Sequence, residues 1–115
     1  MATDNRLGQG WGMLFEAKDP LGRRIILSED WFQTHILLRH PELAKRKKEM
    51  QHALEDPEFI TKAGHGRTLY YRKWDAGPNF LRVVVQLEQG GRHGFVVTAY
   101  WCAGRTGGEI EWPRI

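Results

Sequence analysis

The hydrophobic periodicity of this chain changes once, from helical to alternating, and the change falls at Gly64-His65-Gly66. Before these residues, apolar side chains recur mainly at helical spacing; after them, apolar and polar side chains alternate in three successive stretches. Helices followed by strands with turn-rich connections are typical of an α+β fold. At 115 residues the chain has the size of one domain, so we expect a single core over residues 1–115.

The helical part is predicted to contain two helices that meet at Pro41. Ser28 is a good N-cap, and the two acidic residues after it are favoured by the helix dipole, which predicts a helix over residues 29–39. This helix is apolar on nearly every side and should be buried. Because a proline disfavours helical geometry in the residue before it, we expect the helix to end at His40 and a second helix to cover residues 41–55.

The alternating part predicts three strands, over residues 68–74, 80–88 and 94–102, joined by glycine-rich turns. We therefore expect N-terminal helices packed on a roughly four-stranded antiparallel sheet. Upstream of the helices, the turn-forming Asp19-Pro20-Leu21-Gly22 separates two short apolar stretches and predicts an N-terminal hairpin. Residues 1–10 are polar and predict a frayed terminus, whereas residues 103–115 leave open whether they add a strand.

Strand parity assigns the side chains of the sheet to a core face and a polar face. The core face is predicted to contain Leu69, Tyr71, Leu81, Val83, Val85, Leu87, Phe95, Val97, Ala99 and Trp101. The polar face is predicted to contain Tyr70, Arg72, Arg82, Thr98 and Tyr100. A groove with guanidiniums, a hydroxyl and an aromatic ring suits a phosphodiester with a stacking base, so Tyr70 and Arg82 are predicted substrate contacts.

The densest group of chemically active side chains is His35-Ile36-Leu37-Leu38-Arg39-His40-Pro41-Glu42. His35 and Arg39 are four residues apart, so they project from one face of a helix. Histidine titrates near neutral pH and a guanidinium binds two phosphate oxygens at once, which predicts proton transfer and anion binding here. Structural roles stay open: His35 could be a buried histidine bonded to a carbonyl, His40 could cap the helix end, and Arg39 could pair with a carboxylate.

The charge and cysteine content narrow the partners. Lys and Arg outnumber Asp and Glu by 17 to 14, a formal net charge of +3 that suits a polyanion such as RNA. The basic run over residues 45–48 is either a solvated helix face or a contact to a nucleic-acid backbone. Cys102 is the only cysteine, which excludes an intrachain disulfide and a cysteine zinc cluster, so we expect no metal and no cofactor. The absence of an apolar membrane span or secretory signal favours the cytoplasm and no membrane partner.

The order of several short motifs adds a resemblance. Trp31-Phe32-Gln33-Thr34-His35-Ile36, Arg39-His40-Pro41-Glu42, Leu69-Tyr70-Tyr71-Arg72, Val83-Val84-Val85 and Thr98-Ala99-Tyr100 follow one another over residues 31–100. This set resembles the phage and bacterial nuclease-like domains of the barnase, EndoU, colicin and RelE superfamily. The resemblance implies a nuclease-like core over residues 28–102 and leaves residues 1–27 and 103–115 unexplained.

What the resemblance implies for function is metal-independent RNA cleavage. A helix-borne histidine, a basic residue on an early strand, and a Thr with a following Tyr on a late strand map onto His35, Arg72, Thr98 and Tyr100. His40 is the alternative imidazole and, with Arg39, a predicted substrate contact. Many relatives are prophage toxins restrained by a protein antitoxin. The other hypotheses are a catalytically inactive relative that binds nucleic acid or protein through the same groove, and a prophage accessory domain.

Overall fold

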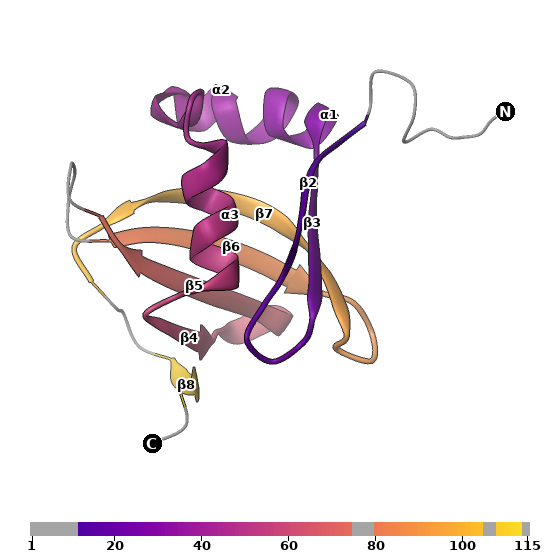
Figure 1. Cartoon of the computed structure of the whole chain (residues 1–115), viewed down its shortest axis with the longest axis vertical. Helices are drawn as coiled ribbons and strands as arrows, with labels where there is room; N and C mark the ends of the chain where they lie inside the picture. Colours follow the sequence, from indigo (N-terminus) through magenta and orange to yellow (C-terminus); the bar gives the residue numbers. More distant parts are fainter. Residues whose placement is uncertain (1–11, 75–79, 105–107, 114–115) are drawn as a thin grey trace, which may run out of the picture.

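The structure is a computed structural model that describes residues 12–74, 80–104 and 108–113, and these ranges form one curved sheet with helices against it (Figure 1). The α+β class is therefore confirmed. The described elements are β2 (Met13–Lys18), β3 (Arg24–Ser28), α1 (Glu29–Trp31), η2 (Phe32–Ile36), α2 (Leu37–Arg39), η3 (Pro41–Leu43), α3 (Lys47–Glu55), β4 (Phe59–Lys62), η4 (Gly64–Gly66), β5 (Arg67–Lys73), β6 (Phe80–Leu87), β7 (His93–Cys102) and β8 (Glu109–Trp112).

The predicted four-stranded antiparallel sheet is wrong in size and in direction. In the described ranges the sheet has seven strands in the order β2-β3-β7-β6-β5-β4-β8, and β3 runs parallel to β7 while every other pair is antiparallel. The predicted hairpin forms, and its second strand joins the rest of the sheet by pairing parallel with β7. Strand β4, of four residues, was not predicted, whereas β8, also of four residues, answers the question left open for the C-terminal tail.

The first predicted helix is confirmed in its bounds and modified inside, but the expectation that it is buried is wrong, since one side is open and Leu38 is 76% exposed. The Ser28 hydroxyl accepts a hydrogen bond from the Trp31 amide at 3.1 Å, and the helix ends before His40, whose φ of −134° lies outside the helical region. Between these ends, residues Phe32–Ile36 form a π-helical turn. The single second helix from Pro41 is wrong: Pro41–Leu43 make one 3-10 turn, Arg46 leaves helical geometry with φ −119°, and α3 begins at Lys47.

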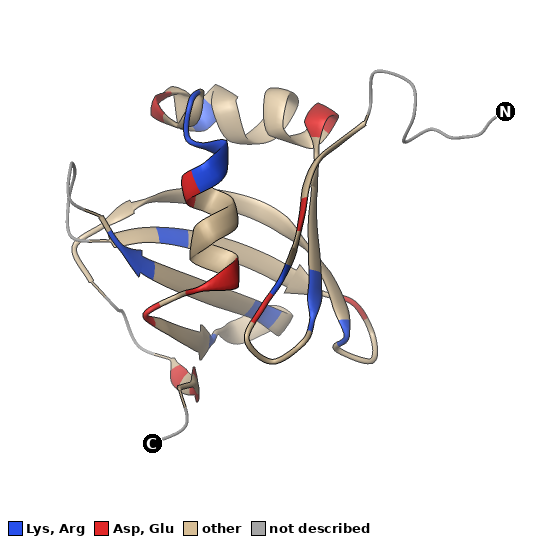
Figure 2. Ribbon diagram, in the orientation of Figure 1, with Lys and Arg blue, Asp and Glu red and all other residues tan. Residues whose placement is uncertain are grey.

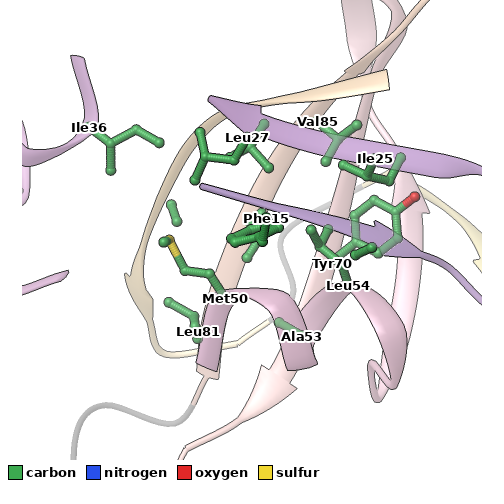
Figure 3. Packing of buried hydrophobic residues seen from close by; sticks show 14 of the residues in the cluster. Phe15, Ile25, Leu27, Ile36, Met50, Ala53, Leu54, Tyr70, Leu81 and Val85 are labelled. Atoms are coloured by element: carbon green, nitrogen blue, oxygen red, sulfur yellow. The ribbon is translucent and has the colours of Figure 1, made fainter. Parts of the chain in front are cut away.

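Helix α3 packs against β2, β5 and β6 and supplies Met50, Ala53 and Leu54 to the core. Figure 3 shows these side chains facing Phe15, Ile25 and Leu27 of the hairpin and Val85 and Leu81 of β6. The predicted parity of β6 is confirmed, since Leu81, Val83 and Val85 are all at most 1% exposed. The apolar half of every one of these elements is thus used within the domain.

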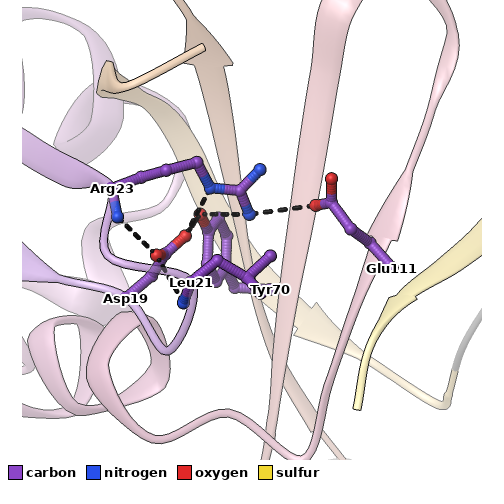
Figure 4. A network of polar contacts seen from close by, with 5 residues as sticks. All are labelled: Asp19, Leu21, Arg23, Tyr70 and Glu111. Atoms are coloured by element: carbon purple, nitrogen blue, oxygen red, sulfur yellow. Dashed lines mark hydrogen bonds and ion pairs between the residues drawn. The ribbon is translucent and has the colours of Figure 1, made fainter. Parts of the chain in front are cut away.

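The parity predicted for β5 is wrong by one residue. Tyr70 pairs with Val83 and is fully buried in the core, while Tyr71 pairs with Arg82 on the opposite face. The two adjacent residues are both tyrosines, so their hydrophobicity could not show which of them faces the core. Tyr70 suits the interior because its hydroxyl has polar partners there, as the buried network in Figure 4 shows.

That network joins the two ends of the curved sheet (Figure 4). The Tyr70 hydroxyl donates to Asp19 Oδ2 at 2.5 Å, and Arg23 Nε donates to the same carboxylate oxygen at 2.7 Å. Arg23 Nη2 reaches Glu111 of β8 at 2.9 Å. Because Asp19 and Arg23 belong to the β2–β3 turn and β8 is the last strand at the other end, these bonds hold the sheet in its curved form.

Strand β7 contains a bulge, so its predicted parity is right on one side of the bulge and wrong on the other. Val84 pairs with Thr98 and the next residue of β6, Val85, pairs with Val96, so Val97 is an extra residue in β7. Beyond the bulge, Ala99 is buried in the core and Trp101 packs against it, as predicted. Before the bulge the faces are exchanged: Val96 is in the core and Phe95, predicted to be buried, is exposed.

Candidate functional site

A cavity of about 530 Å³ lies between the first helical segment and the sheet. The helical segment contributes Trp31, Thr34, His35, Leu38, Arg39 and His40, and the sheet contributes Arg67, Val97, Thr98 and Tyr100. Two local irregularities shape its walls, since His35 lies in the π-helical turn and Val97 and Thr98 lie at the β7 bulge. Both kinds of irregularity redirect side chains and recur at functional sites.

Trp31 connects these two irregular segments. Its indole Nε1 donates to the carbonyl of Val97 at 3.0 Å, and β3 pairs with β7 only as far as Phe95, which leaves this carbonyl accessible to the helix. The other side of the indole lies against His35, with ring centroids 3.5 Å apart and an interplanar angle of 9°. The bulge and the imidazole are therefore held at a defined separation by one side chain.

His35 is exposed, so the alternative of a buried core histidine is wrong. Its Nδ1 is 2.8 Å from the hydroxyl of Thr34, and that hydroxyl donates to the carbonyl of Asp30, also at 2.8 Å. A carbonyl can only accept, so the Thr34 proton is engaged and the hydroxyl can only accept from Nδ1. In the neutral imidazole the proton thus lies on Nδ1, which leaves Nε2 as a proton acceptor.

His40 and Tyr100 form the second pair in the cavity. Their ring centroids are 5.5 Å apart, and Nδ1 of His40 is 3.6 Å from a carboxylate oxygen of Glu42. The Tyr100 hydroxyl accepts a hydrogen bond from Arg82 Nη1. Arg82 itself is 8% exposed and does not line the cavity, so it lies behind Tyr100 and not at the expected substrate-contacting position.

Arg82 remains cationic in this environment. Burial opposes the charged form of its guanidinium, but the hydrogen bond to Tyr100 and the neighbouring Tyr71, Cys102 and Tyr100 outweigh that effect and raise the pKa of Arg82. The guanidinium carbon is 5.0 Å from the ring centre of Tyr71 and 5.3 Å from that of Tyr100. A positive charge thus lies directly against Tyr100, which lines the cavity.

Two arginines face the cavity from opposite walls. Arg39 is exposed and has no hydrogen-bond or ion-pair partner among the described residues. Arg67, on β5, is half-buried and oriented by a 2.8 Å hydrogen bond from its Nε to Gln86 Oε1. Arg67 was not recognised in the sequence, although the correct parity of β5 places it on the same face as Tyr71.

The structure thus brings together five of the predicted site residues, namely His35, Arg39, His40, Thr98 and Tyr100. Arg72 lies elsewhere, because the one-residue correction of β5 turns it toward α3, where its Nη1 donates to the carbonyl of Asp56 and to its carboxylate, the latter at 3.3 Å. Tyr70 is in the core. Trp31 and Thr34 belong to a motif recognised in the sequence, but no role in the site was predicted for them, and their contacts with His35 were not predicted either.

Within the described ranges, no group of three or more His, Cys, Asp and Glu side chains is arranged to hold a metal ion. No helix of the described part is long and apolar enough to cross a membrane. In comparisons with known proteins, the chain matches no family model, no curated protein and no solved structure.

Proposed function

We propose that this cavity is the active site of a small endoribonuclease that cleaves RNA without a metal ion. The observation that carries the proposal is the convergence of two imidazoles, two guanidiniums and three hydroxyls, from segments far apart in the sequence, in one cavity of about 530 Å³. These are the groups that transfer protons, bind a phosphate and stabilise the negative charge of a pentacoordinate phosphorus in the transition state. The resemblance of the motifs to nuclease-like domains points the same way.

In the proposed reaction, Nε2 of His35 removes the proton of a ribose 2′-hydroxyl. The resulting oxygen forms a bond to the adjacent phosphorus, the bond from phosphorus to the 5′-oxygen breaks, and the products are a 2′,3′-cyclic phosphate and a 5′-hydroxyl. The tautomer set by Thr34 supports His35 as the base. His40 would protonate the leaving 5′-oxygen, with Glu42 orienting its ring through Nδ1.

The arginines and hydroxyls would act on the phosphate. Arg39 is available for an anion because no described residue neutralises it, and Arg67 is preoriented by Gln86. Both would bind the non-bridging oxygens as charge develops on them. Thr98 lines the same cavity and would donate a hydrogen bond to a non-bridging oxygen, and Tyr100 would donate its hydroxyl proton or stack on a base.

The test is cleavage of total RNA by the purified protein in EDTA, with analysis of the new termini. The proposal expects 2′,3′-cyclic phosphate ends and no cleavage where the 2′-hydroxyl is replaced by hydrogen. His93→Ala is the matched control for His35→Ala, because His93 is an exposed histidine at the start of β7, outside the cavity. Intact RNA, or equal cleavage by the wild type and His35→Ala, would contradict the proposal; a mobility shift of intact RNA would instead support the binding-domain alternative.

The toxin role is a finer part of the same proposal. The resemblance to domains that a protein antitoxin restrains makes an antitoxin or immunity protein that covers the cavity the expected partner, and the cytoplasm the expected site of action. Induced expression should arrest growth with the wild type and not with His35→Ala. Normal growth with the wild type at the same protein level would remove the toxin role and leave the nuclease proposal to the in vitro assay.

A further inference from the structure

A second feature of the surface is a basic corner, formed by Lys45, Arg46, Lys47 and Lys48 where the chain passes from η3 to α3 (Figure 2). The three lysines are exposed, and none of them has an ion-pair partner among the described residues. Arg46 is 3.8 Å from a carboxylate oxygen of Glu49. Adjacent unneutralised ammonium groups repel one another, so an anionic ligand would be stabilised here.

Two indoles lie beside the basic corner. The guanidinium carbon of Arg46 is 5.2 Å from the ring centre of Trp74, and the rings of Trp74 and Trp101 are 5.0 Å apart at 31°. Trp101 packs against the core, which explains its position. Trp74 is half-exposed and does not belong to the cluster of buried hydrophobic residues or to the residues packed on it. Part of the indole is therefore open to solvent, beside the guanidinium of Arg46 and the ring of Trp101.

The basic corner and the indoles are close to the cavity along the chain. Arg39 and His40 line the cavity, one 3-10 turn follows, and Lys45 comes two residues after that turn. On the sheet, Tyr100 lines the cavity and the next residue, Trp101, points to the opposite face. A polymer that leaves the cavity around this end of β7 would meet the lysines and Trp74.

We propose that the basic corner and Trp74 bind a single-stranded segment of RNA adjacent to the phosphate held in the cavity. This inference rests on the proposed function for the identity of the ligand. The lysines would contact successive phosphates, and Trp74 would stack on an unpaired base, the combination by which proteins hold single strands without reading sequence. A duplex would not fit this role, because its bases are stacked and paired and cannot lie on the indole.

A membrane surface is a poorer ligand for the same lysines. Binding in a bilayer interface requires an apolar helix face that can enter the headgroup region. The apolar residues of α3, Met50, Ala53 and Leu54, are completely buried in the core. The large apolar side chains that are exposed in the described part, among them Leu38 and Phe95, lie outside residues 45–48.

The test measures fluorescence anisotropy of a short labelled 2′-O-methyl RNA strand, which binds as RNA and cannot be cleaved. Lys45→Gln/Lys48→Gln should bind more weakly, and the slope of log affinity against log salt should become shallower by about 1.4, since each lost phosphate contact on a single strand is worth roughly 0.7. The matched control Lys18→Gln/Lys62→Gln removes two exposed lysines from β2 and β4 and should leave the slope unchanged.

Trp74→Leu should weaken binding about tenfold, as expected for one lost stacking contact. The melting temperature of Trp74→Leu shows whether this variant still folds. If it does not fold, the test depends on Lys45→Gln/Lys48→Gln, which replaces exposed side chains only.

The proposal is overturned if the control pair loses as much affinity as the corner pair, if a duplex of the same length binds as tightly, or if phosphatidylserine vesicles bind and RNA does not. Binding with these properties but without cleavage would remove the nuclease proposal and retain this one; cleavage with unaltered binding in the variants would do the reverse.

Discussion

Arg82 Nη1 donates a hydrogen bond of 3.1 Å to the hydroxyl of Tyr100, and the guanidinium lies between the rings of Tyr100 and Tyr71. A guanidinium has donors only, so the Tyr100 oxygen must accept here and its own proton is left for another partner. Tyr100 lines the cavity and Arg82 does not. The arginine therefore positions the tyrosine hydroxyl as a donor toward the cavity.

Removing this contact should lower the rate of RNA cleavage without weakening RNA binding. We expect Arg82→Met to reduce kcat by roughly tenfold with KM unchanged, as for loss of one preorganised donor, and Arg82→Lys to restore part of the rate. Steady-state kinetics of these variants and of Tyr100→Phe provide the check. The double variant should be no slower than Tyr100→Phe alone; multiplied losses would show that Arg82 acts independently of Tyr100.

Replacing either cavity histidine should abolish most of the activity at little cost in stability. We expect His35→Ala and His40→Ala each to lower kcat by roughly a hundredfold to ten-thousandfold, as for loss of a general base or acid. Because the His35 side chain is exposed, its removal should change the free energy of unfolding by less than about 1 kcal/mol. Cleavage assays paired with urea unfolding measure both, and a destabilised His35→Ala that still cleaves RNA would assign the ring a structural role only.

Replacement of Arg67 should slow RNA cleavage, whereas replacement of Arg72, on the same strand, should not. Arg67→Ala should reduce kcat/KM by roughly tenfold to a hundredfold, because it removes a charge-assisted hydrogen bond to the phosphate. Arg72→Ala should leave kcat within about twofold, since Arg72 bonds to Asp56 outside the cavity, beside Trp74. The comparison is internally controlled, because each variant loses one arginine from the same strand. A larger effect at Arg72 would mean that the cavity is not where RNA is cleaved.

The buried network should make the protein lose stability in alkaline solution. Burial, and then the hydrogen bond to Asp19, raise the pKa of Tyr70 above that of an unfolded tyrosine, near 10. Above pH about 10 the unfolded chain therefore releases a proton that the folded chain keeps, so the free energy of unfolding falls with rising pH, by on the order of 1 kcal/mol per pH unit.

Tyr70→Phe tests this assignment by urea unfolding at several pH values. Near neutral pH the variant should be less stable by about 1–3 kcal/mol, because Asp19 and Arg23 lose a buried partner. Its stability should then decline less steeply above pH 10 than that of the wild type. Tyr100→Phe, which lies outside the network, is the control. Equal alkaline slopes for the wild type and Tyr70→Phe would show that Tyr70 is not the group responsible.

The cavity shows how far local patterns reach. The four-residue spacing of His35 and Arg39 and the proline after His40 were sufficient to place His35, Arg39 and His40 together at a helix end, and the structure has them in one cavity. The partner arginine was misassigned. Selecting Arg72 instead of Arg67 followed from the choice of Tyr71 over Tyr70 as the residue that faces the core, which two adjacent tyrosines, both fully buried, could not decide.

The sequence alone determined the local structure: the helix over residues 29–39 between Ser28 and Pro41, the turn that begins at Asp19, and the two faces of β6. These follow from backbone preferences and periodicity within a few residues. Only the tertiary structure decided the β7 bulge, the pairing of β4 with β8, and the burial of Tyr70, because each depends on segments far apart in the chain. Strand register and the partners of a buried hydroxyl are properties of that long-range pairing, and no local pattern encodes them.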